Sequence, residues 1–416
     1  MRIELGFGKG TQTLEAPDRN VLGVIEANEF TPEQTGMEEV RRALAAPIAA
    51  PRLRDVVRPG ERIAIITSDI TRPCPSYLIL PPVLEELRAA GCSLEDVCVV
   101  FALGSHRKHT PEEMRKLVGE EVYGQVRCLD SDPANCVHMG ATSRGTPVDI
   151  FAPVANADRR ICLGNIEYHY FAGYSGGAKA IMPGVSTRAA IQANHSRMVE
   201  EAAKAGQLEG NPVREDIEEV ATLCPIDYIV NVVLDEHKKI VRAVAGHWQQ
   251  AHRAGCRYLD TLYQARIPRR ADIVVTCAAG FPKDINLYQA QKALDNAKHA
   301  VRDGGVIILV GSCAEGLGEK TFERWMLGAA EPRQLIADIQ DHFELGGHKA
   351  AAIAMILERA RILLVSDLEP EFVRSIFMEP YPTVQAAFDA ALADLGPEAS
   401  CWIMPYGGST LPVAEA

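Results

Sequence analysis

Short apolar runs alternate with amphipathic segments along most of this chain. Continuous runs such as residues 62–67 (RIAIIT) and 97–102 are bounded by turn residues, which predicts buried strands. Between them, apolar residues in 76–90 recur at helical spacing and predict a helix. Thr110 followed by Pro111 predicts the start of the next helix, because threonine is a good N-cap and proline suits the first helical position. Strands that alternate with helices indicate an α/β fold with mostly parallel sheets.

This alternation stops at residues 267–270 (IPRR) and then starts afresh. A chain of 416 residues is too long for one ordinary core, so two domains are expected. We predict an N-terminal α/β domain over 1–267 and a C-terminal α/β domain over 268–404, with the tail 405–416 able to return to the first domain. Polar loops follow most predicted strands. Because α/β sheets bind ligands at the carboxyl ends of their strands, we expect an active-site cleft between the domains.

Composition narrows the class of protein. The formal net charge of −12 argues against a nucleic-acid-binding protein, which needs a basic face. No apolar run is long enough to span a membrane, and the first residues (MRIELGFGKG) lack the apolar segment of a signal peptide. The 11 cysteines include no C-x-x-C pair, which argues against zinc-ribbon and iron–sulfur sites. We expect reduced cysteines in a cytoplasmic protein.

One stretch, residues 165–195, concentrates the candidate chemistry. Its central run G-Y-S-G-G-A-K places Gly176 and Gly177 just before Lys179. Alanines stand on both sides of the lysine, where a Walker A loop needs Gly before it and Ser or Thr after it, so nucleotide hydrolysis is not predicted. Glycines still permit close backbone approach to a phosphate or a ring. Lys179 can therefore pair with an anion, act as a nucleophilic amine, or be a solvated surface lysine.

The histidines offer two kinds of chemistry. His195 lies on a predicted helix over residues 187–205, on the same face as apolar residues. This position is typical of a core histidine, or of a ligand for nickel or zinc. No second His or Cys stands at ligand spacing, so a metal would need other ligands. His106 and His169 each follow a predicted strand, where a histidine is a candidate general acid or base. His109 is taken as an ordinary surface histidine.

Two further sets of polar residues are candidates for anion binding. Asp69 and Arg72, in the run SDITRP, follow another predicted strand. The guanidinium suits a carboxylate or phosphate, or else the two residues pair and stabilise their loop. Gln289 and Lys292 share a face near the start of a predicted helix over 287–302, which suits a substrate carboxylate or a solvated face. The run GSCAEGLG (311–318) lacks the G-x-G-x-x-G fingerprint and argues against a dinucleotide-dependent dehydrogenase.

Together these segments resemble the nickel-pincer-nucleotide-dependent lactate racemase family, which comprises 2-hydroxy acid racemases and epimerases. The matching segments occur in the same order through most of the chain. They are SDITRP (68–73), LGSHR (103–107), EYHYFAGYSGGAKAIMPG (167–184), NH (194–195) and FPKDINLYQAQKAL (281–294). The spacing between His169, Lys179 and His195 also matches that of the family.

The resemblance implies a cofactor and a role for each candidate residue. The cofactor is Ni(II)-pyridinium-3,5-bisthiocarboxylate mononucleotide, the nickel-pincer nucleotide, covalently attached at Lys179 with His195 as the protein's metal ligand. By resemblance, His106 and His169 are the catalytic acid–base pair. The remaining candidates bind the nucleotide or the substrate. Those implied for the nucleotide are Asp69, Ile70, Thr71, Arg72, Gly176 and Gly177, and those implied for the substrate carboxylate are Arg72, Gln289 and Lys292.

The implied reaction interconverts D- and L-2-hydroxy acids, with lactate as the default substrate. It proceeds by hydride transfer to the cofactor through a 2-keto acid intermediate, and maturation requires cofactor-synthesis proteins. The alternatives are another 2-hydroxy acid (malate, a longer-chain acid or a sugar acid) and a non-catalytic nickel- or cofactor-binding protein. One departure from the family is the segment HFELGGHKAAAIAMIL, which lacks a tryptophan that lines the substrate pocket in the type enzyme. His348 and Lys349 lie in that segment, and their role is left open.

Overall fold

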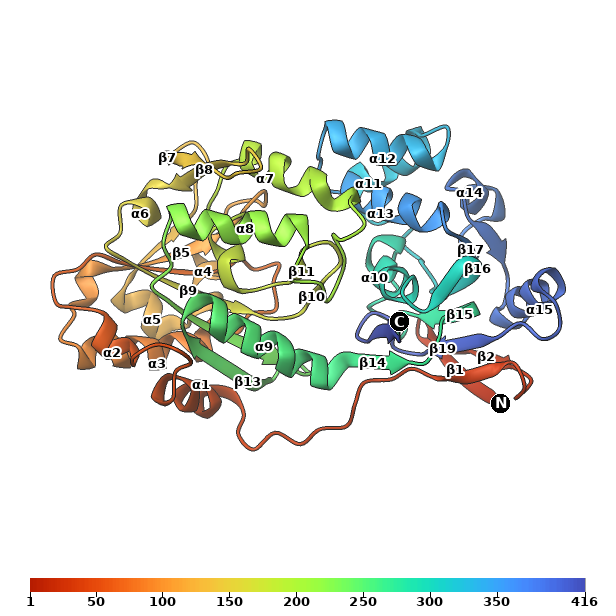
Figure 1. Cartoon of the computed structure of the whole chain (residues 1–416), viewed down its shortest axis with the longest axis horizontal. Helices are drawn as coiled ribbons and strands as arrows, with labels where there is room; N and C mark the ends of the chain where they lie inside the picture. Colours follow the sequence, from red (N-terminus) through yellow and green to blue (C-terminus); the bar gives the residue numbers. More distant parts are fainter. Residues whose placement is uncertain (416) are drawn as a thin grey trace. The chain divides into compact units, whose positions relative to one another are not determined.

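The computed structural model describes residues 1–415 and divides the chain into two compact units (Figure 1). The central unit is Phe30–Thr261, and the discontinuous unit combines Met1–Glu29 with the chain from Leu262 onward. Residues 1–29 were expected in the first domain, and the structure groups them with the second half instead. The boundary also falls at Leu262 rather than after Ile267.

The central unit is built on a six-stranded sheet in the order β13-β12-β9-β4-β5-β6. All neighbouring strands are parallel except β12 and β13, which confirms the predicted α/β class with mostly parallel sheets. The strands of this sheet are β4 (Ile63–Ser68), β5 (Val97–Ala102), β6 (Arg127–Asp130), β9 (Arg159–Asn165), β12 (Tyr228–Leu234) and β13 (Ile240–Gly246). Two small antiparallel pairs accompany it, namely β7 (Cys136–Ala141) with β8 (Pro147–Phe151) and β10 (Tyr168–His169) with β11 (Gly173–Tyr174).

Helices connect these strands. They are α1 (Gly36–Ala45), α2 (Leu53–Val56), α3 (Ser76–Ala89), α4 (Pro111–Val118), α5 (Glu120–Gln125), α6 (Ala152–Ala155), α7 (Arg188–His195), α8 (Pro212–Leu223) and α9 (Trp248–Tyr263), with 3-10 turns η1 (Leu94–Asp96), η2 (Gly177–Ala180) and η3 (Ser196–Val199). The predicted start of α4 is confirmed, because Thr110 and Glu113 form a reciprocal capping box. A membrane-crossing helix needs more length and apolar sequence than any helix within residues 1–415 provides.

The helix predicted over 187–205 is shorter than expected. α7 ends at His195 and a 3-10 turn follows. The Ser196 hydroxyl donates to the Ala193 carbonyl at 3.2 Å, a local bond that competes with continuation of the helix. His195 is nevertheless buried, at 7% exposure, which confirms its predicted inward orientation. The orientation was predicted from a longer helix, whereas α7 ends at His195 itself.

The discontinuous unit holds a second six-stranded sheet, in the order β18-β17-β16-β15-β19-β3, whose neighbours are all parallel. Its strands are β3 (Val21–Val24), β15 (Ala271–Cys277), β16 (Val301–Val310), β17 (Ala360–Val365), β18 (Glu379–Tyr381) and β19 (Cys401–Met404). The chain start joins this unit because β3 pairs with β19. The hairpin of β1 (Arg2–Phe7) and β2 (Gly10–Glu15) also packs Leu5 and Leu14 into its core.

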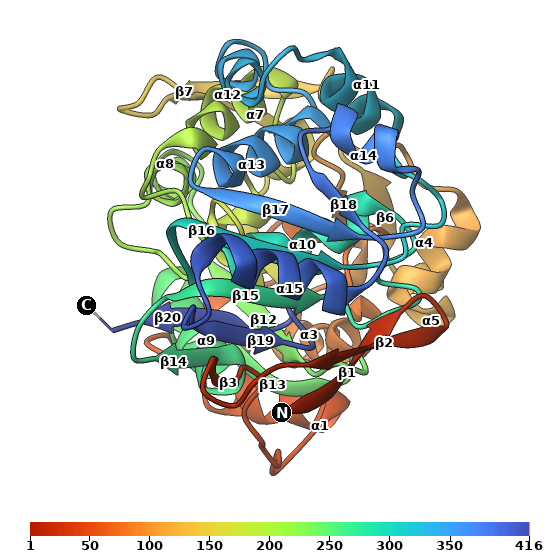
Figure 2. The same cartoon turned by 90° about the vertical axis from the view of Figure 1, so that its right-hand side faces the viewer.

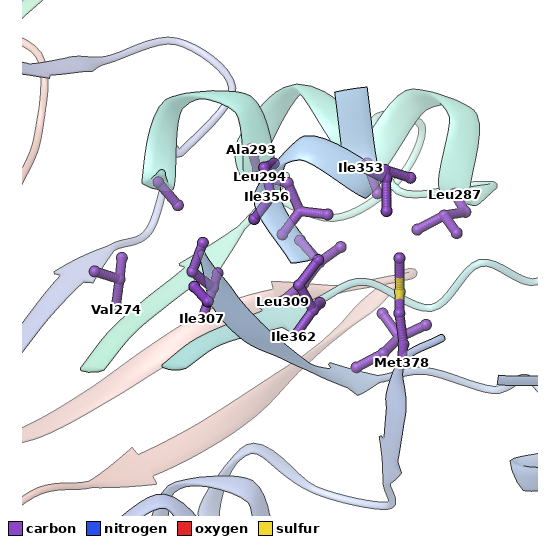
Figure 3. Close-up of a cluster of buried hydrophobic side chains, with 14 of the residues drawn as sticks. Val274, Leu287, Ala293, Leu294, Ile307, Leu309, Ile353, Ile356, Ile362 and Met378 are labelled. Atoms are coloured by element: carbon purple, nitrogen blue, oxygen red, sulfur yellow. The ribbon is translucent and has the colours of Figure 1, made fainter. Parts of the chain in front are cut away.

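Alternate residues of the central strands enter two cores on opposite faces of this sheet. On one face, Leu294 of α10 and Ile353 of α13 meet Ile307 and Leu309 of β16 (Figure 3). On the other face α15 lies across the sheet (Figure 2). Burial on both faces explains why these strands read as continuous apolar runs. The helices are α10 (Leu287–Ala297), α11 (Lys320–Gly328), α12 (Pro332–Asp341), α13 (Gly347–Leu357), α14 (Pro370–Ser375) and α15 (Val384–Leu395).

The chain end also belongs to the discontinuous unit. β20 (Leu411–Ala414) pairs in parallel with β14 (Gln264–Ile267). In the loop before β20, the Gly407 amide donates to the Cys277 carbonyl at 3.0 Å, and Asn296 of α10 donates to the Gly407 carbonyl at 2.7 Å. The tail was expected to return to the first domain. It does pair with residues 264–267, which were predicted in that domain, but the structure assigns these residues to the discontinuous unit.

Candidate active site

The predicted site residues of the central unit follow three adjacent strands. Asp69 comes directly after β4, His106 lies just past β5, and His169 lies just past β9. In the sheet order, β4 leads outward to β5 and β6, whereas β9 leads the other way to β12. Such a reversal of strand order creates a crevice at the carboxyl ends, which is where open α/β sheets bind ligands. The topology therefore gathers these side chains at one edge of the sheet.

Asp69 and His106 form a carboxylate–histidine dyad. His106 Nδ1 donates to Asp69 Oδ2 at 2.8 Å, and the Thr71 hydroxyl donates to Asp69 Oδ1 at 2.9 Å. Burial alone would raise the pKa of Asp69, but the bonds from His106 and Thr71 and the charge of Arg72 hold it below its usual value. A carboxylate at Nδ1 selects the tautomer that leaves Nε2 for proton transfer. Asp69 and Thr71, expected at the cofactor, thus contact a catalytic candidate.

His109 supports the loop that carries this dyad. Its Nε2 accepts from the Ile70 amide at 3.1 Å, and its Nδ1 donates to Asp130 Oδ1 at 2.6 Å. The His109 side chain is only 1% exposed, so the interpretation of a surface histidine is wrong. Ile70 therefore contributes its backbone to the loop, held in place through His109.

The glycine loop before Lys179 has a backbone that requires glycine. Gly176 and Gly177 have φ of +75° and +61°, and a Cβ on Gly177 would lie 3.0 Å from the His252 ring. The Gly177 amide donates to Asn231 Oδ1 at 2.8 Å, and His252 Nε2 donates to the Ser175 carbonyl at 2.8 Å. Sequence reasoning missed both supports. Asn231 could have been singled out from the sequence, because it is an amide within the otherwise apolar and aromatic strand β12 (YIVNVVL).

Lys179 is a half-buried amine with a perturbed pKa. Burial lowers the pKa well below its usual value, and the charges of Arg214 and Arg72 lower it further. Arg214 is itself fully buried. Within residues 1–415 no side chain forms an ion pair or hydrogen bond with the Lys179 amine, which lies 5.9 Å from the centre of the Phe171 ring. A lowered pKa favours the neutral, nucleophilic form of an amine, which supports the nucleophile interpretation over that of a solvated surface lysine.

Phe171 brings three of the predicted residues together. Its ring centre is 4.5 Å from that of His169 and 5.0 Å from that of His195, both edge-on, and Lys179 approaches it as well. Phe171 is 2% exposed, and its carbonyl accepts from Asn211 Nδ2 at 2.9 Å. Nothing in the sequence pattern distinguishes this phenylalanine from a core residue, and its role is visible only in the fold.

The His195 imidazole is held in one tautomer by its neighbour. Its Nδ1 lies 2.8 Å from Asn194 Oδ1. The amide nitrogen of Asn194 donates to the Val213 carbonyl at 3.0 Å and to Asp216 Oδ2 at 2.8 Å. Because the Asn194 nitrogen is directed there, its oxygen faces His195 and accepts the Nδ1 proton, which leaves the lone pair on Nε2. This is the form in which a histidine binds a metal.

The chain does not supply a complete set of metal ligands here. Across residues 1–415 no group of three or more His, Cys, Asp or Glu is arranged to hold a metal ion. A metal at His195 would therefore take its other ligands from a bound group. This donor set fits a cofactor that carries its own metal ligands.

The predicted substrate residues Gln289 and Lys292 belong to the discontinuous unit. Both are exposed on the first turns of α10, opposite the face that packs Leu294 into the core. Asn286 caps this helix by accepting from the Gln289 amide at 3.0 Å. Arg72, in the central unit, is also exposed. The sequence predicts that Arg72, Gln289 and Lys292 bind the same substrate, and this remains a prediction.

The lowered pKa of Asp69 predicts a pH-dependent loss of stability. A carboxyl whose pKa is lower in the folded than in the unfolded chain stabilises the fold above the unfolded value of about 3.9, and this contribution disappears as pH falls through the folded value. At pH 7 we expect Asp69→Asn to lower the free energy of unfolding by about 1–3 kcal/mol. Urea titrations between pH 7 and pH 3 should show the difference shrinking. A constant difference would contradict the assignment.

The fold and this site define the class of protein. Two α/β units, with a carboxylate–histidine dyad and a second histidine in loops that follow strands, are features typical of an α/β enzyme. Two family models match the chain: the lactate racemase N-terminal domain over residues 7–206 and the lactate racemase C-terminal domain over 267–411.

Similar proteins agree with these models. The lactate racemase of Thermoanaerobacterium thermosaccharolyticum is 33% identical, over 98% of each chain. That of Lactiplantibacillus plantarum is 32% identical, over 97% of this chain and 98% of its own. The structure of the Thermoanaerobacterium apoprotein superposes with a TM-score of 0.88, covering 99% of this chain and 100% of that one at 32% identity. A crystal structure from Thermotoga maritima shares the fold at a TM-score of 0.62 and 16% identity, over 93% of this chain. The chain therefore belongs to the lactate racemase family and is an isomerase.

Proposed function

We propose that this isomerase interconverts the D and L forms of a 2-hydroxy acid, lactate by default, with a nickel-pincer nucleotide attached to Lys179. The observation that carries the proposal is the gathering of His169, Lys179 and His195 around the Phe171 ring. These three residue types supply a base, a nucleophilic tether and a metal ligand. The names of the similar proteins support lactate as the substrate.

The residues present fit this cofactor. Lys179 would form the covalent link, since its depressed pKa favours the neutral amine. Glycine at 176 and 177 lets the loop pack closely against Asn231 and His252, which fixes the backbone that carries Lys179. His195 would bind the nickel through Nε2, and Arg72 would pair with the phosphate or the substrate. When bound, the group would accept a hydride from the substrate and return it.

The acid–base work falls to two histidines. The α-hydrogen of a 2-hydroxy acid is a very weak acid, so its removal as hydride is easier if a base takes the hydroxyl proton. His106, oriented by Asp69, would take that proton from one enantiomer, and His169 would take it from the other. The same histidines return the proton when the 2-keto acid is reduced on its other face. Arg72, Gln289 and Lys292 would hold the carboxylate meanwhile.

A chiral assay in deuterated water tests the proposal. The protein is produced together with cofactor-synthesis proteins and is then given one enantiomer of lactate in D₂O. We expect the opposite enantiomer to form without deuterium at the α-carbon, because a hydride does not exchange with solvent. Deuterium at that carbon would indicate proton abstraction and refute the hydride route. No product from lactate or from any other 2-hydroxy acid tested would refute the racemase.

The substrate panel should include malate and longer 2-hydroxy acids. In the segment that lacks the family's pocket tryptophan, His348 and Lys349 are each 8% exposed on α13. The Lys349 amine donates to the Tyr288 carbonyl and lies 3.8 Å from the Tyr288 ring centre. Aromatic rings nevertheless surround this segment, since Trp325 lies against Gly347 and the Phe343 ring centre is 5.6 Å from that of His348. A faster rate with a larger acid would replace lactate as the substrate.

The cysteines support the proposed location. All 11 are free, as expected for a protein that works in the reducing cytoplasm. The cofactor-synthesis proteins are the proposed maturation partners.

A further inference from the structure

The strand that carries His169 is too short to hold itself in place. β10 and β11 contribute two residues each, with Tyr168 opposite Tyr174 and His169 opposite Gly173. An isolated pair of strands this short has little stability of its own. Other contacts must therefore set the position of His169.

A single carboxylate on α9 binds both tyrosines of this hairpin. The Tyr168 hydroxyl donates to Asp260 Oδ1 at 2.8 Å, and the Tyr174 hydroxyl lies 2.8 Å from Oδ1 and 3.0 Å from Oδ2. The two rings pack at 5.4 Å between centres. We call Tyr168, Tyr174 and Asp260 the tyrosine clamp. Its anchor, α9, is a helix of 16 residues, so the hairpin is tied to a rigid element.

The clamp holds the hairpin from the face opposite His169. Cross-strand partners share a face of the pair and successive residues alternate between faces, so Tyr168 and Tyr174 project to one side and His169 to the other. Behind the hairpin, Gly173 lies so close to the Gln207 carbonyl that a Cβ would sit 2.0 Å from it. The Gly173 carbonyl accepts from the Gly206 amide at 3.1 Å, so the hairpin is held at both ends of its backbone. On the face opposite the clamp, His169 Nδ1 accepts from the Ala172 amide at 3.2 Å.

The charges are arranged to keep this clamp closed near neutral pH. Burial raises the pKa of both tyrosines, and the neighbouring Asp260 charge raises it further. The hydroxyls thus remain protonated donors. Burial raises the pKa of Asp260, while the bonds from the tyrosines favour the ionised acceptor. Arg253 and Arg257 line an open cavity of about 390 Å³ together with Asp260, so water can fill the space left by a shorter side chain.

We propose that Asp260 is a positioning residue that, through the hydroxyls of Tyr168 and Tyr174, holds the hairpin presenting His169 to the substrate. The proposal rests on the acid–base role proposed above for His169. It assigns no contact between Asp260 and the substrate. Its effect should therefore fall on the rate of proton transfer rather than on substrate binding.

The test compares Asp260→Ala with Asp260→Asn in the cofactor-loaded protein. We expect Asp260→Ala to lower kcat by about 10- to 100-fold with little change in KM, because a small misplacement of a base costs rate. Asp260→Asn should restore most of the rate, since the amide oxygen still accepts from a tyrosine. Adding Tyr168→Phe and Tyr174→Phe to Asp260→Ala should cause little further loss. An unchanged kcat in Asp260→Ala, or no rescue by asparagine, would overturn the proposal.

Two controls separate the possible failures. Glu86→Ala removes a carboxylate of the same unit that is 4% exposed and binds Arg52 and Arg54, so it reports the cost of lost stability alone and should keep kcat. His169→Ala tests the underlying role. If His169→Ala keeps full activity, the proposed base is wrong. If it is inactive while Asp260→Ala matches the wild type, only the clamp is wrong.

A measurement without turnover completes the test. Imidazole titration of His169, followed by NMR in the cofactor-free protein, should shift in Asp260→Ala, return in Asp260→Asn and stay unchanged in Glu86→Ala. An unshifted His169 in Asp260→Ala would show that the hairpin holds its place without the carboxylate and would overturn the proposal.

Discussion

Replacement of Lys179 by alanine is expected to abolish both the covalent cofactor adduct and racemisation. The amine is the proposed point of attachment, and burial and the charge of Arg214 lower its pKa, which favours the neutral, reactive form. Loss of the cofactor removes the group that carries the hydride, so activity should fall by at least about 10⁴-fold. Intact mass after co-production with the cofactor-synthesis proteins measures the adduct, and a chiral assay measures the rate.

Three variants define the role of this lysine. Lys179→Arg keeps a long basic side chain but not the nucleophilic amine, so it should also lack the adduct. Lys204→Ala removes an exposed lysine of the same unit and should keep both adduct and rate. His195→Ala should keep the adduct on Lys179 and lose the nickel, which metal analysis would detect. A full adduct on Lys179→Ala would place the tether elsewhere and refute the assignment.

Replacement of His106 or His169 by alanine is expected to lower racemisation by about 10²- to 10⁴-fold, the usual contribution of a positioned acid or base. The two enantiomers are equal in free energy, so kcat/KM must fall equally in both directions. The oxidation of each enantiomer to the 2-keto acid, measured separately, should differ between the two variants. In a single turnover, one variant should still oxidise the D enantiomer and the other the L enantiomer. Rapid-quench detection of the 2-keto acid, starting from each enantiomer, measures this difference.

A third histidine provides the matched control for this pair. His138 is exposed and its Nδ1 lies 2.7 Å from Asp149, so it reproduces a histidine–carboxylate pair outside the proposed site. His138→Ala should keep the wild-type rate. Equal loss of both half-reactions in His106→Ala would contradict the assignment of one base to each enantiomer, because a single base would then serve both faces.

Apolar periodicity and helix caps in the sequence predicted most strands and helix starts correctly. The apolar run before Asp69 became β4, and Thr110 caps α4 with Glu113 as its sequence indicated. The helix predicted over 287–302 begins where expected, after Asn286, but the prediction runs too far. α10 ends at Ala297, and β16 begins at Val301. Caps and periodicity act between residues a few positions apart, so they are readable in the sequence.

Apart from the two helices that end early, the errors concern partners that are distant along the chain. Residues 1–29 were predicted in the first domain, yet β3 pairs with β19. Nothing in the sequence of β3 indicates which strand it pairs with. The tail reaches residues 264–267 as expected, but the structure places these residues in the discontinuous unit and not in the first domain. His109 was taken as a surface residue because its bonds to Ile70 and Asp130 depend on loops brought together by the sheet.

By itself, the sequence determined the α/β class, most strands and caps, the family motifs, and the identities of Lys179, His169 and His195. Only the tertiary structure decided that Asp69 orients His106, that Phe171 packs against His169 and His195, and that Asn231 and His252 support the glycine loop. It also revealed the tyrosine clamp. The reason is physical: residue type sets what a side chain can do, whereas the order of strands in the sheet sets which side chains meet.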